Sequence, residues 1–189
     1  MESRDDTTAA DRIFAAAFKE LILIEGGYTD NPLDSGGKTC YGITEQTARS
    51  WGYRGRIDEL PLETARAIYK KHYWTNRSLD QVAAFVPRIA TKLFDAGVNV
   101  GGSRSTRWLQ LALNALNNRS KRWTDLHVDG ILAKDTIAAL KQAILVYHME
   151  ETIYKALNCM QGNYYIELAL TRKKDQVFLR GWLDNRIFH

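Results

Sequence analysis

Residues 25–44 read EGGYTDNPLDSGGKTCYGIT. This stretch is the most informative part of the chain, because an apolar helix ends at its first residue, Glu25, and a glycine-rich loop follows. Apolar residues recur before it at helical spacing: Ile13, Ala17, Leu21 and Ile24. The spacing predicts an amphipathic helix over residues 11–24 with Asp11 as its N-cap, and the two glycines after Glu25 then stop it. Glu25 is therefore expected in the last helical turn.

The position of Glu25 favours a protonated carboxyl group. The negative end of the helix dipole disfavours an ionised carboxylate there, and apolar neighbours disfavour it further. A glutamate that holds its proton near neutral pH can act as a general acid, the group that protonates the leaving oxygen in glycoside cleavage. The alternative is a solvated glutamate at a frayed helix end.

The loop after Glu25 is rich in glycine, since five of the 13 glycines of the chain lie between residues 26 and 42. Glycine allows backbone dihedral angles that other residues rarely adopt. A long ordered loop is also more often functional than a short connector. Asp34 and Thr39 lie in this loop and could place a second carboxylate and a hydroxyl across a cleft from the acid, where they would activate and orient water. The alternatives are an Asp34 that bonds its own turn and a Thr39 that is an ordinary strand residue.

These residues also form a pattern: Glu25-Gly26-Gly27-Tyr28, then Asp34, Gly36-Gly37, Thr39 and Gly42-Ile43-Thr44. The pattern resembles the signature of glycoside hydrolase family 108, which comprises N-acetylmuramidases found as phage endolysins and as bacterial muramidases linked to toxin export. The resemblance implies that Glu25 is the catalytic acid. Asp34 and Thr39 are similar to the second and third members of the Glu, Asp, Thr trio of phage lysozymes, where the spacing from Asp to Thr is one residue longer.

A second resemblance begins at Asp95. The stretch DAGVNVGGSRSTRWLQLALNAL, followed by residues 128–132 and Thr136, is similar to the predicted peptidoglycan-binding region that usually follows this catalytic segment. Peptidoglycan glycan strands are therefore the implied substrate.

The two resemblances divide the chain into three parts. We expect a disordered terminus at residues 1–10, a catalytic region at 11–94 and a helical binding region at 95–189. No linker rich in Pro or in Gly and Ser separates the last two, so we expect them to pack as one compact body. Helical periodicity dominates after the loop, and only the loop has room for a small β-hairpin. The predicted fold is mainly α and lysozyme-like, with that hairpin or loop element after the first long helix.

Aromatic residues are plentiful, with five Trp and nine Tyr in 189 residues. Flat aromatic faces can stack on the apolar faces of sugar rings, although most aromatic side chains belong to the core. Tyr28 and Tyr41 are predicted to bind substrate because they lie in the signature. Trp74 and the pair Tyr164 and Tyr165 are further candidates.

Cysteine and metal chemistry are disfavoured. Cys40 lies beside Thr39, but none of the four histidines has a local pattern that marks it as a partner for a nucleophilic thiol. The sequence has no His-Glu-x-x-His, paired Cys-x-x-Cys or calcium-loop spacing. We expect an enzyme without a metal ion or cofactor, and with free thiols at Cys40 and Cys159.

The net charge of +4 and the pI near 9.0 imply attraction to a polyanion. Nucleic acid is the rival partner because cations gather near the C-terminus: Arg172, Lys173, Lys174, Arg180 and Arg186. These residues alternate with acidic and apolar ones, and no pair of turn and recognition helix is evident. We therefore expect no nucleic-acid partner, and the positive charge would aid adsorption to the anionic cell envelope.

The sequence shows no convincing membrane span or secretion signal. The apolar run of residues 13–24 is broken by Lys19 and Glu20 and follows acidic residues where a signal peptide has positive charge. We expect a monomer without stable membrane insertion, made in the cytoplasm and active in the periplasm or cell wall after export. The family implies a holin-type pore as the export route.

Three functions fit these observations, in order. The first is a muramidase that hydrolyses the β-1,4 bond between N-acetylmuramic acid and N-acetylglucosamine. The second is a lytic transglycosylase, which would use Glu25 without activated water and leave an anhydro sugar. The third is a non-catalytic peptidoglycan-binding protein. Retention or inversion depends on the distance between carboxylates in space, which the sequence does not give.

Overall fold

The computed structural model describes residues 8–29 and 37–187, and its architecture is mainly α, as predicted. The α-helices of these residues are α1 (Ala9–Glu25), α2 (Glu45–Trp51), α3 (Leu62–Tyr69), α4 (Leu79–Ala83), α5 (Pro87–Val100), α6 (Gly102–Ala115), α7 (Lys134–Leu145), α8 (Glu150–Thr171) and α9 (Gln176–Arg186). Shorter segments are the 3₁₀ turns η1 (Ile57–Glu59), η3 (Thr75–Arg77) and η4 (Lys173–Asp175), and the π-helical segment η2 (Lys70–Trp74). The strands are β1 (Tyr28–Thr29), β2 (Thr39–Cys40) and β3 (Ile43–Thr44).

Helix α1 begins earlier than the apolar spacing indicated. Thr8, not Asp11, is the N-cap: its hydroxyl accepts a hydrogen bond from the Asp11 backbone N–H at 3.1 Å. The Asp11 carboxylate accepts the Thr8 backbone N–H in return, at 3.2 Å, which completes a capping box. One face of the helix is buried, and its residues are Phe14, Ala17, Phe18 and Leu21. The helix ends at Glu25 because Gly26 adopts a φ of 72°.

The expected small hairpin is a three-stranded antiparallel sheet in the order β1-β2-β3. Thr39 lies opposite Thr29 of β1 and opposite Thr44 of β3. Strands β2 and β3 are joined by the two-residue turn of Tyr41 and Gly42, whose φ angles are 53° and 73°. Positive φ at both positions is what a tight hairpin turn of this kind requires.

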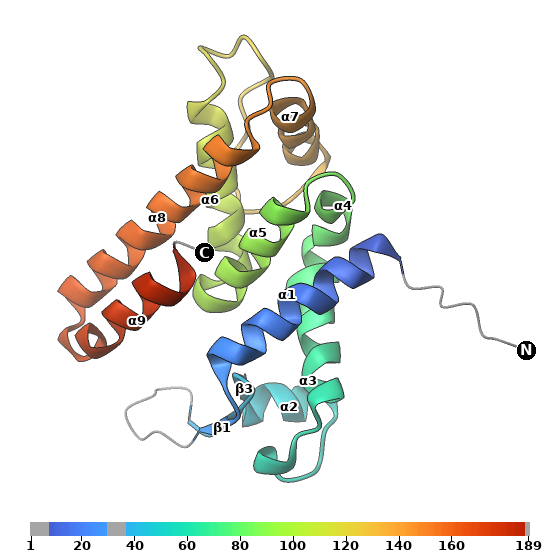
Figure 1. The fold of residues 1–189 in the computed structure, drawn as a ribbon, viewed down its shortest axis with the longest axis vertical. Coiled ribbons are helices and arrows are strands. Elements are labelled where there is room, and N and C mark those ends of the chain that lie inside the picture. The colour runs from blue at the N-terminus through green and yellow to red at the C-terminus, as the bar shows by residue number, and fades with distance from the viewer. Residues whose placement is uncertain (1–7, 30–36, 188–189) are drawn as a thin grey trace, which may run out of the picture.

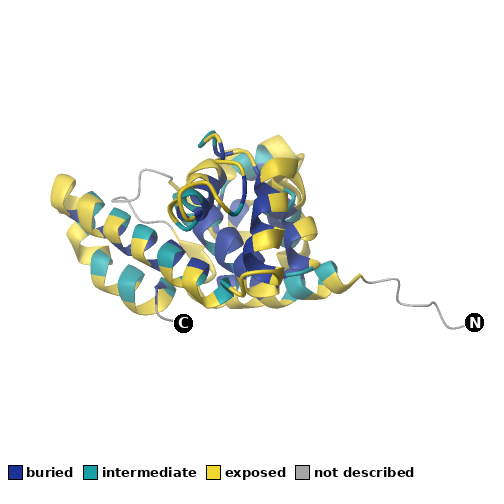
Figure 2. Cartoon of the chain, turned by 90° about the horizontal axis from the view of Figure 1, so that it is seen from above, coloured by how far each residue is buried: buried dark blue, intermediate teal, exposed yellow. Residues whose placement is uncertain are grey.

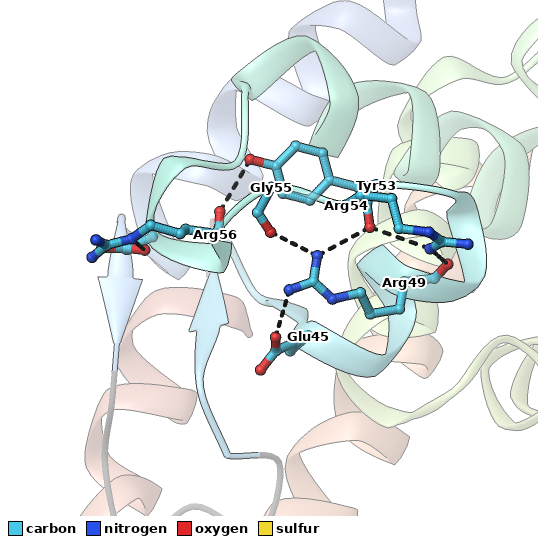
Figure 3. Close-up of polar contacts among 7 residues, drawn as sticks. Glu45, Arg49, Tyr53, Arg54, Gly55 and Arg56 are labelled. Carbon is cyan, nitrogen blue, oxygen red and sulfur yellow. Dashed lines mark hydrogen bonds and ion pairs between the residues drawn. The ribbon is translucent and has the colours of Figure 1, made fainter.

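Arg49 is one of the residues that hold the loop between α2 and η1, as Figure 3 shows. The Arg49 guanidinium donates hydrogen bonds to the carbonyls of Tyr53 and Gly55, at 3.1 and 2.6 Å, and to the carboxylate of Glu45 at 2.7 Å. Helix α2 ends at Gly52, which has a left-handed φ of 103°. This loop leads into η1, which packs beside β2.

Helix α5 lies at the centre of the molecule, with α1 and α4 on one side and α6 and α8 on the other (Figure 1). A single hydrophobic cluster runs from Phe14 of α1 to Leu157 of α8. The expected division at residues 94 and 95 falls inside α5, which is a continuous helix. Both halves of the chain therefore bury apolar side chains in the same core.

Helices α8 and α9 form a hairpin at one end of the molecule (Figure 1). Figure 2 shows that this hairpin carries mainly exposed and half-buried residues, whereas the buried residues gather in the rest of the body. The end of α9 nevertheless returns to α5, where Ile187 is 3% exposed. Within the described residues, no helix combines the length and the apolar character that a membrane crossing needs.

Candidate active site

Glu25 occupies the last position of α1, as predicted, and its side chain is 22% exposed. The following Gly26 donates its N–H to the carbonyl of Ile22 at 3.0 Å, so the backbone leaves the helix directly after the carboxylate. The Oε1 atom of Glu25 accepts a hydrogen bond from Nη2 of Arg186 at 2.8 Å. The carboxylate is therefore held by an ion pair rather than left at a frayed helix end.

The tight turn between β2 and β3 lies against the same carboxylate. A Cβ atom placed on Gly42 would lie 2.9 Å from Oε2 of Glu25 and 2.6 Å from the hydroxyl of Tyr69. Only glycine fits, because both its φ and its surroundings exclude a side chain. The turn is fixed from two sides: Tyr69 donates its O–H to the carbonyl of Tyr41 at 2.9 Å, and the Tyr41 N–H bonds the carbonyl of Gly27 at 3.2 Å.

Tyr69 is a neutral hydrogen-bond donor beneath the turn. Its side chain is 1% exposed, and burial, reinforced by the Glu25 carboxylate, raises the pKa of Tyr69 far above its ordinary value. The phenol therefore keeps its proton at any pH at which the enzyme would work. This keeps the turn, and with it the approach to Glu25, in one conformation.

Arg186 joins two carboxylates from different helices. Besides Glu25 of α1, its guanidinium bonds Oδ1 of Asp95 on α5 at 2.6 Å. The arginine side chain is 6% exposed, and its backbone carbonyl accepts a hydrogen bond from Nζ of Lys92 at 2.8 Å. Burial lowers the pKa of Lys92 to about 8. The site thus contains two carboxylates and two cations in partly buried surroundings.

Of the two other predicted catalytic residues, the structure describes Thr39 but not Asp34. Thr39 is half-buried on β2, one residue before the Cys40 that pairs with Tyr28. It therefore lies in the small sheet whose turn contacts Glu25. Asp34 lies outside the described residues, so the position of the second carboxylate stays a prediction.

Of the aromatic candidates, the two from the signature belong to the small sheet whose turn contacts Glu25. Tyr28 is 44% exposed on β1, and Tyr41 is half-buried in the turn that contacts the carboxylate. Trp74 is placed differently: it is 1% exposed, with its ring 5.5 Å from that of Phe14 and 5.7 Å from that of Phe94. The indole of Trp74 is a core side chain.

Tyr164 and Tyr165 both lie on α8, but they differ in burial. Tyr165 is 1% exposed; its hydroxyl donates to Oδ1 of Asn99 and accepts from Gln161, both at 2.7 Å. Burial raises the pKa of Tyr165 to about 12. Tyr164 is half-buried beneath the guanidinium of Arg104, which lies 4.5 Å from its ring centre. Tyr165 thus ties α8 to α5, and Tyr164 is the one of the pair with an accessible edge.

Cys40 is placed as a structural residue. It is 3% exposed and pairs with Ile43 in the sheet. Burial raises the pKa of its thiol, whereas a nucleophilic cysteine needs a lowered one. Both cysteines are free thiols, as expected, and Cys159 is exposed on α8.

Sequence reasoning missed three residues that contact or support Glu25: Tyr69, Asp95 and Arg186. Tyr69 and Asp95 carry no motif that marks them as site residues, and Arg186 was counted only among the C-terminal cations. The ion pair of Arg186 with Glu25 joins residues 161 positions apart, so no local spacing could have indicated it. The cue present in the sequence was Gly42, since a glycine at a tight turn can mark a close approach of side chains.

A cavity of about 700 Å³ lies between α1, α5 and the α8–α9 hairpin. Its lining combines apolar side chains with charged ones: Glu20, Arg88, Lys92, Asp95 and Arg186. Arg186 therefore lines this cavity and also bonds Glu25, which is not among the lining residues.

Comparisons with known proteins found two family models that match the chain. Residues 18–101 match the family described as glycosyl hydrolase 108, and residues 104–187 match the predicted peptidoglycan domain. The structure is similar to that of Brucella abortus SagA, with a TM-score of 0.68 and 24% sequence identity over 90% of this chain and 87% of that one. At this identity the likeness concerns the fold alone. No curated protein matches the sequence significantly.

Proposed function

Because residues 18–101 belong to glycosyl hydrolase family 108 and a peptidoglycan-binding domain follows them, the chain is a peptidoglycan hydrolase, and we propose that it is an N-acetylmuramidase. The bond cleaved would be the β-1,4 bond between N-acetylmuramic acid and N-acetylglucosamine. Glu25 would act as the general acid.

The observation that carries this proposal is the setting of the Glu25 carboxyl group. One oxygen is held by Arg186 at 2.8 Å, and the other faces the turn at Gly42, next to Tyr41. A carboxyl group that is fixed through one oxygen can present the other to a leaving-group oxygen in a constant geometry. Its partial burial also strengthens each electrostatic interaction within the site.

We propose that Asp34 and Thr39 act on the water molecule that attacks the sugar. Asp34 would be the base or the charge stabiliser, and the hydroxyl of Thr39 would orient the water. If the enzyme inverts the anomeric centre, the carboxyl groups of Glu25 and Asp34 should lie about 6.5 to 9.5 Å apart in the working enzyme, which leaves room for that water. Tyr28 and Tyr41 would supply faces for the sugar rings on either side of the bond.

Exchange of Glu25 for glutamine tests the acid. Glu25→Gln keeps the size of the side chain and a hydrogen-bond acceptor for Arg186 but has no proton to donate. We expect release of soluble fragments from dye-labelled peptidoglycan to fall on the order of a thousandfold. Binding to insoluble peptidoglycan and the circular dichroism spectrum should be unchanged.

Glu63→Gln is the matched control, because Glu63 lies on α3 with 79% of its side chain exposed. It should behave as the wild type does. Turnover at the wild-type rate by a folded Glu25→Gln protein would remove Glu25 from the mechanism.

A further inference from the structure

Arg186 is a buried cation that the C-terminal domain supplies to the hydrolase region. It is the last residue of α9, within the domain at 104–187, whereas Glu25 and Asp95 both lie within residues 18–101. Its two terminal nitrogens bond one carboxylate each, at 2.8 and 2.6 Å, and its side chain is 6% exposed. A planar guanidinium suits such a bridge because its donors have a fixed relative geometry.

We propose that Arg186 is a positioning residue of the hydrolase: it fixes the Glu25 carboxyl group and stabilises the charge that Glu25 acquires when its proton leaves. The C-terminal domain then completes the catalytic site as well as contacting the wall. The proposal rests on the proposed role of Glu25 as the general acid.

The physical reason is that the interaction between Arg186 and Glu25 grows during the reaction. A protonated Glu25 is neutral and interacts weakly with a guanidinium. As the proton moves to the glycosidic oxygen, Glu25 becomes a carboxylate, and its attraction to the cation at 2.8 Å rises. An interaction that is stronger in the transition state than in the ground state accelerates the chemical step.

Loss of the cation should therefore lower kcat without raising KM, and only in an enzyme that still has Glu25 as its acid. A purely structural role of Arg186 would not depend on Glu25 in this way.

The other charged and titratable groups around the pair do not replace Arg186. Asp95 of α5 shares the guanidinium, and Lys92 of the same helix donates to the Arg186 carbonyl rather than to Glu25. Burial raises the pKa values of Tyr69 on α3 and Tyr165 on α8, so both phenols stay neutral. Arg186 is thus the cation that the structure aims at Glu25.

The test compares three substitutions on α9. Arg186→Gln removes the charge. Arg186→Lys keeps the charge but lacks the planar guanidinium whose two terminal nitrogens bond Glu25 and Asp95. Arg180→Gln is the matched control, because the Arg180 side chain is 93% exposed and pairs with Asp184 at 3.4 Å, one helical turn away. Initial rates are measured over a range of concentrations of soluble peptidoglycan fragments, which gives kcat and KM for each variant.

We expect Arg186→Gln to lower kcat on the order of tenfold to a hundredfold, with little change in KM. Arg186→Lys should recover part of kcat. Arg180→Gln should give the wild-type kcat and KM.

Removal of Arg186 leaves two partly buried carboxylates without their partner, so folding has to be separated from catalysis. The double variant Arg186→Gln with Asp95→Asn removes one of these negative charges and should still show the loss of kcat seen with Arg186→Gln. In a Glu25→Gln background, Arg186→Gln should cause no further loss of rate, since its effect acts through Glu25.

Three results are distinguishable. A folded Arg186→Gln protein, or its double variant, with the wild-type kcat overturns the proposal. An equal loss of rate from Arg186→Gln in the Glu25→Gln background also overturns it, because that outcome indicates a structural role that does not act through Glu25. Failure of the wild-type enzyme itself to release reducing N-acetylmuramic acid ends contradicts the proposed function instead.

Discussion

Gly42→Ala perturbs the contact between the tight turn and Glu25 with a single added carbon. The new Cβ would lie 2.6 Å from the Tyr69 hydroxyl and 2.9 Å from Oε2 of Glu25, closer than a methyl group can approach either. The residue would also keep a φ of 73°, which costs a non-glycine residue about 1 to 2 kcal/mol. Both the turn and the carboxyl group must therefore shift.

Tyr69 can move only by giving up its buried hydrogen bond. Its ring packs against those of Phe18, Tyr73 and Phe94, and its hydroxyl bonds the Tyr41 carbonyl at 2.9 Å. Leaving such a buried group unsatisfied costs about 1 to 3 kcal/mol. Together with the backbone strain, we expect Gly42→Ala to lower the free energy of unfolding by roughly 2 to 5 kcal/mol.

Gly52→Ala is the control for backbone strain alone. Gly52 has a φ of 103°, and an added Cβ would meet no atom within 4 Å. We expect it to lose about 1 to 2 kcal/mol and to keep full turnover per folded molecule. Gly42→Ala should in addition lose roughly tenfold or more in turnover, because displacement of a catalytic group by a fraction of an ångström is costly.

Urea denaturation gives the two stabilities, and release of dye from labelled peptidoglycan gives turnover, with enzyme concentration corrected for the folded fraction. The reasoning fails if Gly42→Ala loses no more stability than Gly52→Ala and keeps its turnover. If the two variants lose the same stability and only Gly42→Ala loses turnover, the added carbon has displaced Glu25 rather than Tyr69.

Three further predictions follow from the core and from the division of the chain. Burial lowers the pKa of Lys92 from its ordinary value of 10.5 to about 8, so between these two pH values the unfolded chain binds more protons than the folded chain. As the pH rises across that range, the free energy of unfolding of the wild type should increase by roughly 3 kcal/mol relative to that of Lys92→Met, measured by urea denaturation. A difference between the two proteins that does not change with pH would refute the assignment. Trp74→Phe should lower the free energy of unfolding by roughly 1 to 3 kcal/mol and leave KM unchanged, since the indole lies in the core; a raised KM would return Trp74 to the substrate site. A fragment of residues 1–101 should be unstable and inactive, because it exposes the face of α5 that contacts α6 and α8 and lacks Arg186; a cooperatively melting, active fragment would show an autonomous catalytic unit.

Much of the fold could be predicted from local patterns. The helix that ends at Glu25 and the hairpin after it followed from apolar spacing and glycine, both of which act through backbone geometry over a few residues. The start of α1 was misplaced because the aspartate of a capping box occupies the third helical position, so Asp11 resembled a cap while Thr8 performed that role. Local rules succeed where one turn of chain sets the structure.

The parts of the site that could not be predicted depend on tertiary contacts. Trp74 closes the π-helical segment η2, where the helical face is displaced from the 3.6-residue period, so spacing did not reveal that it is buried. Arg186 belonged to a basic cluster that reads as a solvated face, yet α9 carries it back to α5 and Glu25. Only the packing of the α8–α9 hairpin decides which of those cations is buried.

Mass analysis of the muropeptides released from purified peptidoglycan tests the central claim most directly. Hydrolysis by a muramidase predicts soluble fragments with reducing N-acetylmuramic acid ends, and none with the Glu25→Gln enzyme. Fragments with 1,6-anhydro-N-acetylmuramic acid ends would show a lytic transglycosylase, reducing N-acetylglucosamine ends would show cleavage of the other glycosidic bond, and intact glycan strands would show a binding protein; each of these results would contradict the account.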